Sequence, residues 1–292
     1  SGLMDEFIDL PPGGGGIAPL AERIKLIRGL KCEAALYLSE PSSRPALLKE
    51  MLFFKLCGIS SIQGLPFAGK LRNYRPADGN LWESEAARLL RVVAGAGHAT
   101  TDWSFQFSEQ EFETAENLVQ GLAGSNGHIA FSIGAKLPDK DWGDANWTQV
   151  LGELSGRYPQ LGLLSVGAEE DRARTIRVTK AWTGPSLNLC GASEPRISAL
   201  AMKDAAFYLG HDSGPMHLAA LAGTSCVAVF SARAKPGVWF PHGDGHRIFY
   251  PWDMADQVTA KAGFRTAGQS IQTITPAEVI RACILGIEQM GG

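Results

Sequence analysis

Apolar and polar residues follow two different periods along most of this 292-residue chain. Short apolar runs that end at glycine or at charged residues predict strands, whereas longer stretches with apolar residues three and four positions apart predict helices. The two kinds of segment alternate along the chain. This alternation is typical of a parallel sheet with helices on both faces, so we expect an α/β fold.

The first half of the chain carries a short series of such segments. Helices are expected over residues 17–28, 45–57 and 83–94, a buried strand over 32–38 and another short strand over 59–62. Before them, a strand-like fragment at 5–10 leads to four glycines at 13–16. No strand leads cleanly into these glycines and no Lys-Ser or Lys-Thr pair follows them, so we interpret them as a connection rather than a phosphate loop.

A second, more regular series begins near residue 128. Its expected strands are 128–133, 161–166, 187–189, 205–210 and 227–230, and its expected helices are 109–122, 146–155, 169–181, 194–203 and 276–289. Residues 99–108 are polar and aromatic without a period, which suits an interdomain connector. We therefore expect four parts: a partial Rossmann-like domain over 1–100, a connector and helix over 101–126, a second Rossmann-like domain over 127–274, and a C-terminal helix within 275–292.

One segment of the second series joins an apolar run that ends at Gly210 to an expected helix. Asp212 or Ser213 can cap that helix, and Pro215 suits its first turn. Gly214 allows a ligand to approach the backbone, and a helix N-terminus offers free N–H groups with a partial positive charge. The segment therefore predicts a site for a diphosphate.

Further polar segments follow the neighbouring strands, at the strand ends where open α/β sheets bind ligands. Gly134 to Lys140 brings a glycine and two lysines, Lys136 and Lys140, which suit a phosphate. The carboxylate of Glu169 can either cap the next helix or accept the hydroxyls of a ribose. Backbone groups of residues 188–191 can read a nucleobase edge or form a simple turn.

Charge and composition narrow the choice of partners. A net charge of −3 and a pI near 6.1 argue against a general nucleic-acid binder. Five scattered cysteines without metal-ligand spacing indicate reduced thiols in a cytoplasmic protein, and no metal cluster is visible. No apolar run is long enough to span a membrane. Residues 17–75 nevertheless hold ten Lys or Arg against four Glu, which are either solvated helix faces or a surface for an anionic acceptor or membrane face.

Together, these polar segments resemble glycosyltransferase family 9, the ADP-heptose:lipopolysaccharide heptosyltransferases and their relatives. The motifs that carry the resemblance are Lys140-Asp141-Trp142 with Trp147, Gly167-Ala168-Glu169-Glu170, Asn188-Leu189-Cys190-Gly191, the run from Asp212 to Ala220, and the run from Pro236 to Gly243. The similarity is strong over residues 128–250 and looser over 7–125.

The resemblance implies a GT-B architecture, in which two Rossmann-like domains face each other across a cleft and the second holds a nucleoside-diphosphate sugar, with an ADP-sugar expected. Carried over by position, Lys140 neutralises the diphosphate, with Ala135 and Lys136 beside it. Hydroxyl residues often stand at those two places in the heptosyltransferases, so Ala135 departs from the pattern. No metal or other cofactor is implied.

The remaining donor contacts are implied in the same way. Glu169 matches the family's ribose-binding acid, and residues from Leu189 to Gly191 approach the base. Asp212, Ser213 and Gly214 form the phosphate turn. His217 lies on the first turn of the following helix, where it either touches the diphosphate or holds the turn in place.

The activity implied is inverting transfer of a heptose-like sugar to a lipopolysaccharide-type or other envelope saccharide, by a cytoplasmic protein in peripheral contact with the membrane face. Family members begin with a strand and a Gly-x-Leu-Gly-Asp-type loop whose Asp is the usual candidate base. We find no such element, so we name no catalytic residue and expect that the chain lacks the opening strand–helix–strand. The C-terminal helix is expected to pack toward the first domain.

Two other kinds of protein fit parts of the pattern. A GT-B nucleotide-sugar epimerase would need paired carboxylates and a histidine, and Glu169 with Glu170 is the candidate pair. A donor-binding protein without transfer activity is the third possibility, because the catalytic loop is missing from the pattern.

Overall fold

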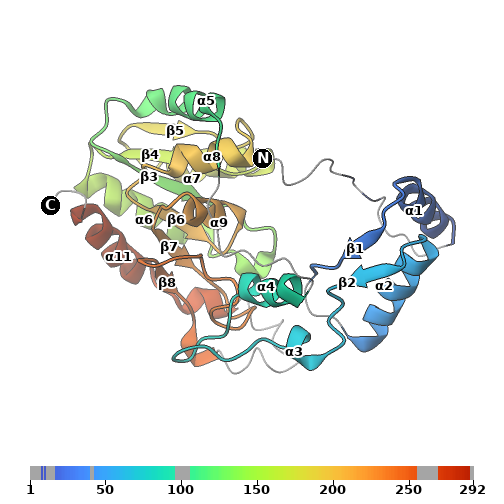
Figure 1. The fold of residues 1–292 in the computed structure, drawn as a ribbon. Coiled ribbons are helices and arrows are strands. Elements are labelled where there is room, and N and C mark those ends of the chain that lie inside the picture. The colour runs from blue at the N-terminus through green and yellow to red at the C-terminus, as the bar shows by residue number, and fades with distance from the viewer. Residues whose placement is uncertain are drawn as a thin grey trace. The chain divides into compact units, whose positions relative to one another are not determined.

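The computed structural model describes residues 8, 10, 17–39, 43–95, 106–254 and 269–289. The chain divides into two compact units, residues 1–102 (unit 1) and 103–292 (unit 2). Much of the expected connector over 99–108 and most of the strand-like fragment over 5–10 lie outside the described residues. Figure 1 labels the elements of both units.

The described residues of unit 1 form a parallel strand pair and four helices. Its elements are α1 (Ile17–Gly29), β1 (Ala34–Leu36), α2 (Arg44–Leu56), β2 (Ser61–Gln63), α3 (Gly69–Arg72) and α4 (Glu85–Gly95). The Ser43 hydroxyl caps α2, whose first turn holds Pro45. The strand expected over 32–38 forms, but the prediction that it is buried is wrong, because Leu36 is 45% exposed.

Buried polar groups supplement a small apolar core in unit 1. Ile27, Cys57 and Ile59 pack together. The Arg88 side chain is fully buried and donates to the carboxylate of Glu85 and to the Ser39 carbonyl at 2.8 Å. A buried guanidinium is stable only with such partners, so Arg88 fixes the chain around α4.

Unit 2 has a six-stranded parallel sheet covered by helices. Its strands are β3 (His128–Ser132), β4 (Gly162–Ser165), β5 (Ser186–Asn188), β6 (Tyr208–His211), β7 (Cys226–Val229) and β8 (Arg247–Phe249). Its helices are α5 (Glu109–Val119), α6 (Asp144–Arg157), α7 (Arg172–Thr179), α8 (Pro195–Met202), α9 (Gly214–Leu221) and α11 (Pro276–Glu288), with the 3-10 turns η1 (Gln120–Leu122), η2 (Pro138–Lys140), η3 (Glu169–Asp171) and η5 (Ile271–Thr273).

The strand order is β5-β4-β3-β6-β7-β8, and every neighbouring pair is parallel. The chain moves outward from β3 in one direction and then returns to β6 on the other side of β3. This is the Rossmann order, whose switch point between β3 and β6 is where open α/β sheets bind ligands.

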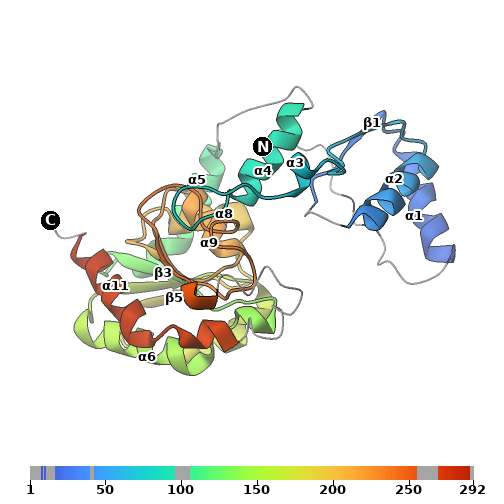
Figure 2. The ribbon, with the colours of Figure 1, turned by 90° about the horizontal axis from the view of Figure 1, so that it is seen from below.

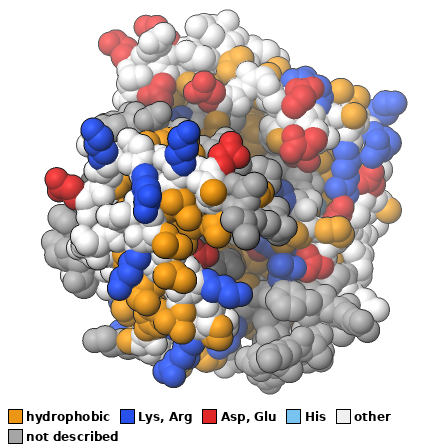
Figure 3. Space-filling view, turned by 90° about the vertical axis from the view of Figure 1, so that its right-hand side faces the viewer, with side chains coloured by type: hydrophobic (Ala, Val, Ile, Leu, Met, Phe, Trp, Pro, Cys, Tyr) orange, Lys and Arg blue, Asp and Glu red, His pale blue; other side chains and the backbone are white. Residues whose placement is uncertain are grey.

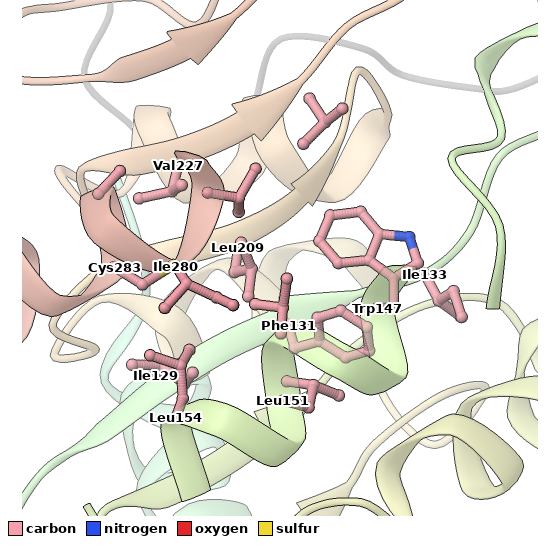
Figure 4. Close-up of a cluster of buried hydrophobic side chains, with 14 of the residues drawn as sticks. Ile129, Phe131, Ile133, Trp147, Leu151, Leu154, Leu209, Val227, Ile280 and Cys283 are labelled. Carbon is pink, nitrogen blue, oxygen red and sulfur yellow. The ribbon is translucent and has the colours of Figure 1, made fainter. Parts of the chain in front are cut away.

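Alternate residues of the sheet enter two cores. On one face, Ile129 and Phe131 of β3 pack with Trp147 of α6 and with α11 (Figure 4). On the other face, Ala130 packs with residues of α8 and α9. Figure 2 shows α6 and α11 on one side of the sheet and α8 and α9 on the other. Unit 2 is therefore a three-layer, doubly wound domain that holds the carboxyl ends of its strands in fixed positions.

The first and last helices of unit 2 also belong to these layers. α5 packs against α8, and the Ser108 hydroxyl and Glu111 carboxylate form a capping box at its start. The apolar face of α11 contributes Val279 and Cys283 to the core shared with α6 and β7. The expectation that α11 packs toward the first domain remains a prediction.

Candidate nucleotide-sugar site

The expected polar segments of unit 2 lie at one edge of the sheet, because each directly follows a parallel strand. The segments after β3 and β6 are neighbours at the switch point, and those after β4 and β5 are neighbours on one side of it. Sequence positions 72 residues apart are thereby brought into contact, as the bond between Lys140 and Asp212 shows.

Lys140 and Asp212 form the centre of the site. The Lys140 ammonium lies 2.6 Å from Oδ2 of Asp212, and the two side chains are 20% and 9% exposed. Asp212 directly follows β6, and Ser213 occupies the N-cap position of α9 in an extended conformation without bonding the helix N–H groups through its side chain. A cation, a helix N-terminus and an exposed glycine, Gly214, therefore converge where a diphosphate is expected.

His211, which the sequence pattern did not single out, holds this centre in place. Its ring is fully buried, and Nε2 accepts the Trp142 backbone N–H at 3.0 Å and the Trp147 indole N–H at 3.2 Å. Burial lowers the pKa of His211 to about 4. An Nε2 that accepts two N–H groups carries no proton, so His211 is neutral and ties the segment of Lys140 to the end of β6.

A second set of bonds ties the same segment to α7. Arg174 donates to Asp141 at 2.8 Å and to Asp144 at 2.6 Å, and Asp141 also accepts the Gly143 N–H at 2.8 Å. Hydrogen bonds from Arg174 and Gly143 hold the pKa of Asp141 below its usual range, against the opposing effect of burial. The segment after η2 is thus fixed from both sides of the switch point.

The expected ribose and base segments lie in direct contact. Glu169 is exposed and pairs with Arg172 at 3.1 Å. Gly191 has a φ of +67°, and a Cβ there would lie 2.8 Å from the Glu169 Cα and would overlap the carboxylate. Only glycine fits this approach, so Gly191 positions Glu169 at the rim of the site.

The backbone N–H groups of the base segment already have partners. Leu189 donates to Ser165 O at 2.8 Å, Cys190 to Asn188 Oδ1 at 2.9 Å, and Gly191 to Gly167 O at 2.9 Å. A nucleobase at this position would therefore meet carbonyl acceptors rather than N–H donors.

Asp171 is a further residue of this site, to which the sequence pattern gave no separate role. It accepts the Ala168 N–H at 3.2 Å. A Cβ on Gly134 would lie 2.5 Å from its carboxylate, and one on Gly167 would lie 3.2 Å from it. Asp171 thus holds together the loops after β3 and β4, and two glycines make room for it.

The other expected residues surround the centre more loosely. His217 lies on the first turn of α9 with its ring edge-on to Trp239, at 6.2 Å between centroids. Burial lowers its pKa, partly offset by the charge of Asp212. Ala135 is half-buried and Lys136 is exposed on the loop after β3.

The described part of the chain contains no group of three or more His, Cys, Asp or Glu side chains placed to hold a metal. Its helices include none with the length and apolar character that a bilayer span requires.

Unit 1 has a cavity of its own beside the end of β2. It measures about 330 Å³ and is lined by Met51, Lys55, Ser60, Ile62, Gly64, Leu65 and Phe67. Gly64 follows β2 with a φ of +82°, and a Cβ there would lie 2.7 Å from Tyr37 O, so glycine is required for the chain to pass β1.

Solved structures share this architecture. A glycosyltransferase family 9 protein from Veillonella parvula aligns with a TM-score of 0.64 at 16% identity, over 94% of this chain and 81% of that one. The E. coli ADP-heptose heptosyltransferase II aligns with 0.61 at 19% identity, over 94% and 82%. The E. coli heptosyltransferase WaaC with ADP aligns with 0.57 at 16% identity, over 92% and 79%. No curated protein matches the chain in sequence.

The strand order is that of a Rossmann-like α/β domain, and the fold is that of the GT-B heptosyltransferases. The sequence model of glycosyltransferase family 9 (heptosyltransferase) matches residues 70–260, more than half of the chain. The chain therefore belongs to glycosyltransferase family 9 and is a glycosyltransferase, as the residues of the second half predict.

Proposed function

We propose that this protein transfers a heptose-like sugar from an ADP-sugar to a lipopolysaccharide-type or other envelope saccharide, with inversion at the anomeric carbon. The observation that carries the proposal is the convergence of Lys140, Asp212 and the N-terminus of α9 at the switch point. The names of two similar structures support the choice of nucleotide, because they include ADP or ADP-heptose.

In the proposed reaction, a base on the acceptor side removes the proton of an acceptor hydroxyl, and its oxygen attacks the anomeric carbon as ADP leaves. Negative charge then increases on the leaving β-phosphate. Lys140 and the N–H groups at the start of α9 stabilise this charge more in the transition state than in the bound donor, which accelerates the reaction.

The proposed donor contacts divide among the strand ends. The diphosphate is held by Lys140, with Ala135 and Lys136 beside it. It also contacts the turn of Asp212, Ser213 and Gly214, next to His217. Glu169 accepts the ribose hydroxyls, and the carbonyl oxygens between Leu189 and Gly191 accept the amino group of the base. We propose that unit 1 binds the anionic saccharide acceptor and that the protein works in the cytoplasm at the membrane face.

Calorimetry with ADP-, UDP- and GDP-sugars tests the proposal. We expect the ADP-sugar to bind most tightly and to be consumed only when acceptor is added. Consumption of the donor alone would instead favour an epimerase, and binding without consumption would favour a donor-binding protein. Failure of all three donors to bind would contradict the assignment of the site.

A charge variant links this binding to the site. Lys140→Gln removes a charge-assisted contact to the diphosphate, which is worth about 1.5–3 kcal/mol, so we expect the Kd for ADP to rise at least about tenfold. Lys180→Gln, an exposed lysine just after α7, is the matched control and should leave the Kd unchanged. An unchanged Kd in Lys140→Gln would remove Lys140 from the site.

A further inference from the structure

Helix α2 of unit 1 exposes a stripe of leucines. Leu48, Leu52 and Leu56 are 52%, 57% and 43% exposed, and their spacing of four residues places them along one side of the helix. The outward side of a surface helix is normally polar. Here the helix is apolar both inward and outward.

The inward side of α2 already has its own packing residues. Leu47 is fully buried, and Cys57, directly after the helix, is 3% exposed in the core with Ile27 and Ile59. The outer leucines are therefore not needed for the core of unit 1, and their exposure calls for another explanation.

Cations flank the stripe on both sides. At 100° per residue, Arg44 and Lys55 lie on one side of the leucines and Lys49 on the other. Glu50, the one acid of α2, is two residues from both Leu48 and Leu52 and so points to another side of the helix. The outward face of α2 thus combines apolar side chains with positive charge alone.

Helix α1 extends this surface. Arg28 donates to the Leu56 carbonyl at 2.9 Å, so the ends of α1 and α2 lie side by side. Leu26 and Leu30, at and just beyond the end of α1, are 39% and 42% exposed. The combined leucine–cation surface consists of Leu26, Leu30, Leu48, Leu52, Leu56, Arg28, Arg44, Lys49 and Lys55. Figure 3 shows hydrophobic side chains gathered among lysines and arginines on one face of the molecule.

We propose that the leucine–cation surface binds the headgroup region of an anionic lipid bilayer. Leucines on a helix that lies in the membrane plane enter the boundary of the acyl chains, and long cationic side chains reach the lipid phosphates. Charge argues against a second copy as the partner, because two such surfaces would place like charges face to face. The inference deepens the proposed function, since it names the surface by which unit 1 meets a lipid-linked acceptor.

Sedimentation of the full chain with phosphatidylcholine vesicles, with and without phosphatidylglycerol, tests the proposal. We expect binding to the anionic vesicles, weakened by salt. Lys49→Gln and Lys55→Gln should each lower the partition coefficient about fivefold, because one cation near an anionic surface contributes about 1 kcal/mol. Leu52→Ser should also weaken binding, since it removes apolar area that enters the bilayer.

Matched variants on unit 2 serve as controls. Leu285→Ser changes a leucine that is 53% exposed on α11, and Lys180→Gln changes an exposed lysine. Both should bind vesicles like the wild type, and circular dichroism checks that every variant is folded. The proposal is overturned if the wild type does not bind anionic vesicles, or if the control variants lose as much binding as the variants of the leucine–cation surface. It is also overturned if Leu52→Ser converts a dimer to monomers without weakening vesicle binding. ADP calorimetry on the same samples shows whether the donor site binds nucleotide. Loss of vesicle binding can therefore be told apart from failure of the proposed donor site.

Discussion

His211 illustrates how burial fixes the charge of a residue. Two N–H groups point at its Nε2, and the ring is fully buried beside Trp147, with 5.0 Å between ring centroids. Protonation would remove the acceptor for both tryptophans and place a charge in the core. The neutral ring is thus a condition for the folded arrangement around Lys140.

This condition predicts a pH dependence of stability. Burial depresses the folded-state pKa of His211 from 6.5 to about 4. Between pH 6.5 and about 4, His211 therefore binds a proton in the unfolded chain but not in the folded chain. The free energy of unfolding falls as the pH drops through this range. The loss from this one group reaches about 3 kcal/mol. The lowered pKa values of His128 and His217 act in the same direction.

Urea unfolding at pH 7 and pH 4.5, followed by fluorescence, measures the effect. The free energy of unfolding of His211→Gln should fall less between the two pH values than that of the wild type. Lys180→Gln changes an exposed lysine just after α7 and should keep the wild-type difference. An equal fall in all three proteins would mean that His211 does not titrate as described.

Among single residues, the sequence pattern predicted the charged groups of the candidate site but not the residues that hold those groups in place. Lys140, Asp212 and Glu169 follow strands and carry charge, which is a local signal. His211 is the last residue of β6, directly before Asp212, but its role depends on two tryptophans 64 and 69 residues away. Its partners become visible only once the strand order is known.

At the scale of elements, the start of α9 gives the sharpest test of the phosphate turn. A Cβ on Gly214 would meet no atom of the protein within 4 Å. Gly214→Ala should therefore fold normally, while its methyl group occupies space at the start of α9, where the diphosphate would lie. We expect ADP affinity to fall at least about tenfold, since each charge-assisted hydrogen bond lost costs about 1.5–3 kcal/mol.

Gly156→Ala is the matched control, because Gly156 lies within α6 and also has open space around its Cβ position. Gly156 is the next-to-last residue of α6, so that variant should gain at most about 0.5–1 kcal/mol of stability, and it should leave ADP affinity unchanged. Unchanged affinity in Gly214→Ala would place the diphosphate elsewhere.

Most elements of unit 2 were predictable, because buried parallel strands are continuous apolar runs with clear ends. β8 was missed, since its three residues begin with an arginine and carry too little pattern. The helix expected over 169–181 instead starts with the 3-10 turn η3 and ends at Thr179. In unit 1 the apolar run around β1 suggested burial, but whether a strand is covered depends on its neighbours, which the run itself does not specify.

At the scale of the whole molecule, the two units differ in how much core they contain. Unit 2 holds two large apolar clusters, one on each face of its sheet, whereas the core of unit 1 centres on Ile27, Cys57 and Ile59. Every donor residue proposed above belongs to unit 2. Donor binding should therefore stabilise that unit selectively.

Denaturation with and without ADP measures this selectivity. Ligand at 100 times its Kd should stabilise unit 2 by about 2.7 kcal/mol. Six of the seven tryptophans lie within residues 103–292, so fluorescence follows unit 2, and the fluorescence midpoint should move to higher urea. We expect unit 1 to unfold at lower urea than unit 2, in a transition that circular dichroism detects. The midpoint of that earlier transition should be the same with and without ADP. A uniform shift of both signals would show that the units unfold as one.

The ion pair between Lys140 and Asp212 has a consequence for selectivity among anions. A carboxylate 2.6 Å from the ammonium already neutralises the charge that a phosphate would seek. Inorganic phosphate or sulfate must compete with Asp212 and gains only the contacts at the start of α9. In the proposed binding mode, a nucleotide competes with Asp212 too but also engages the ends of β4 and β5. Under that proposal, the ion pair favours binding of the donor over binding of simple anions.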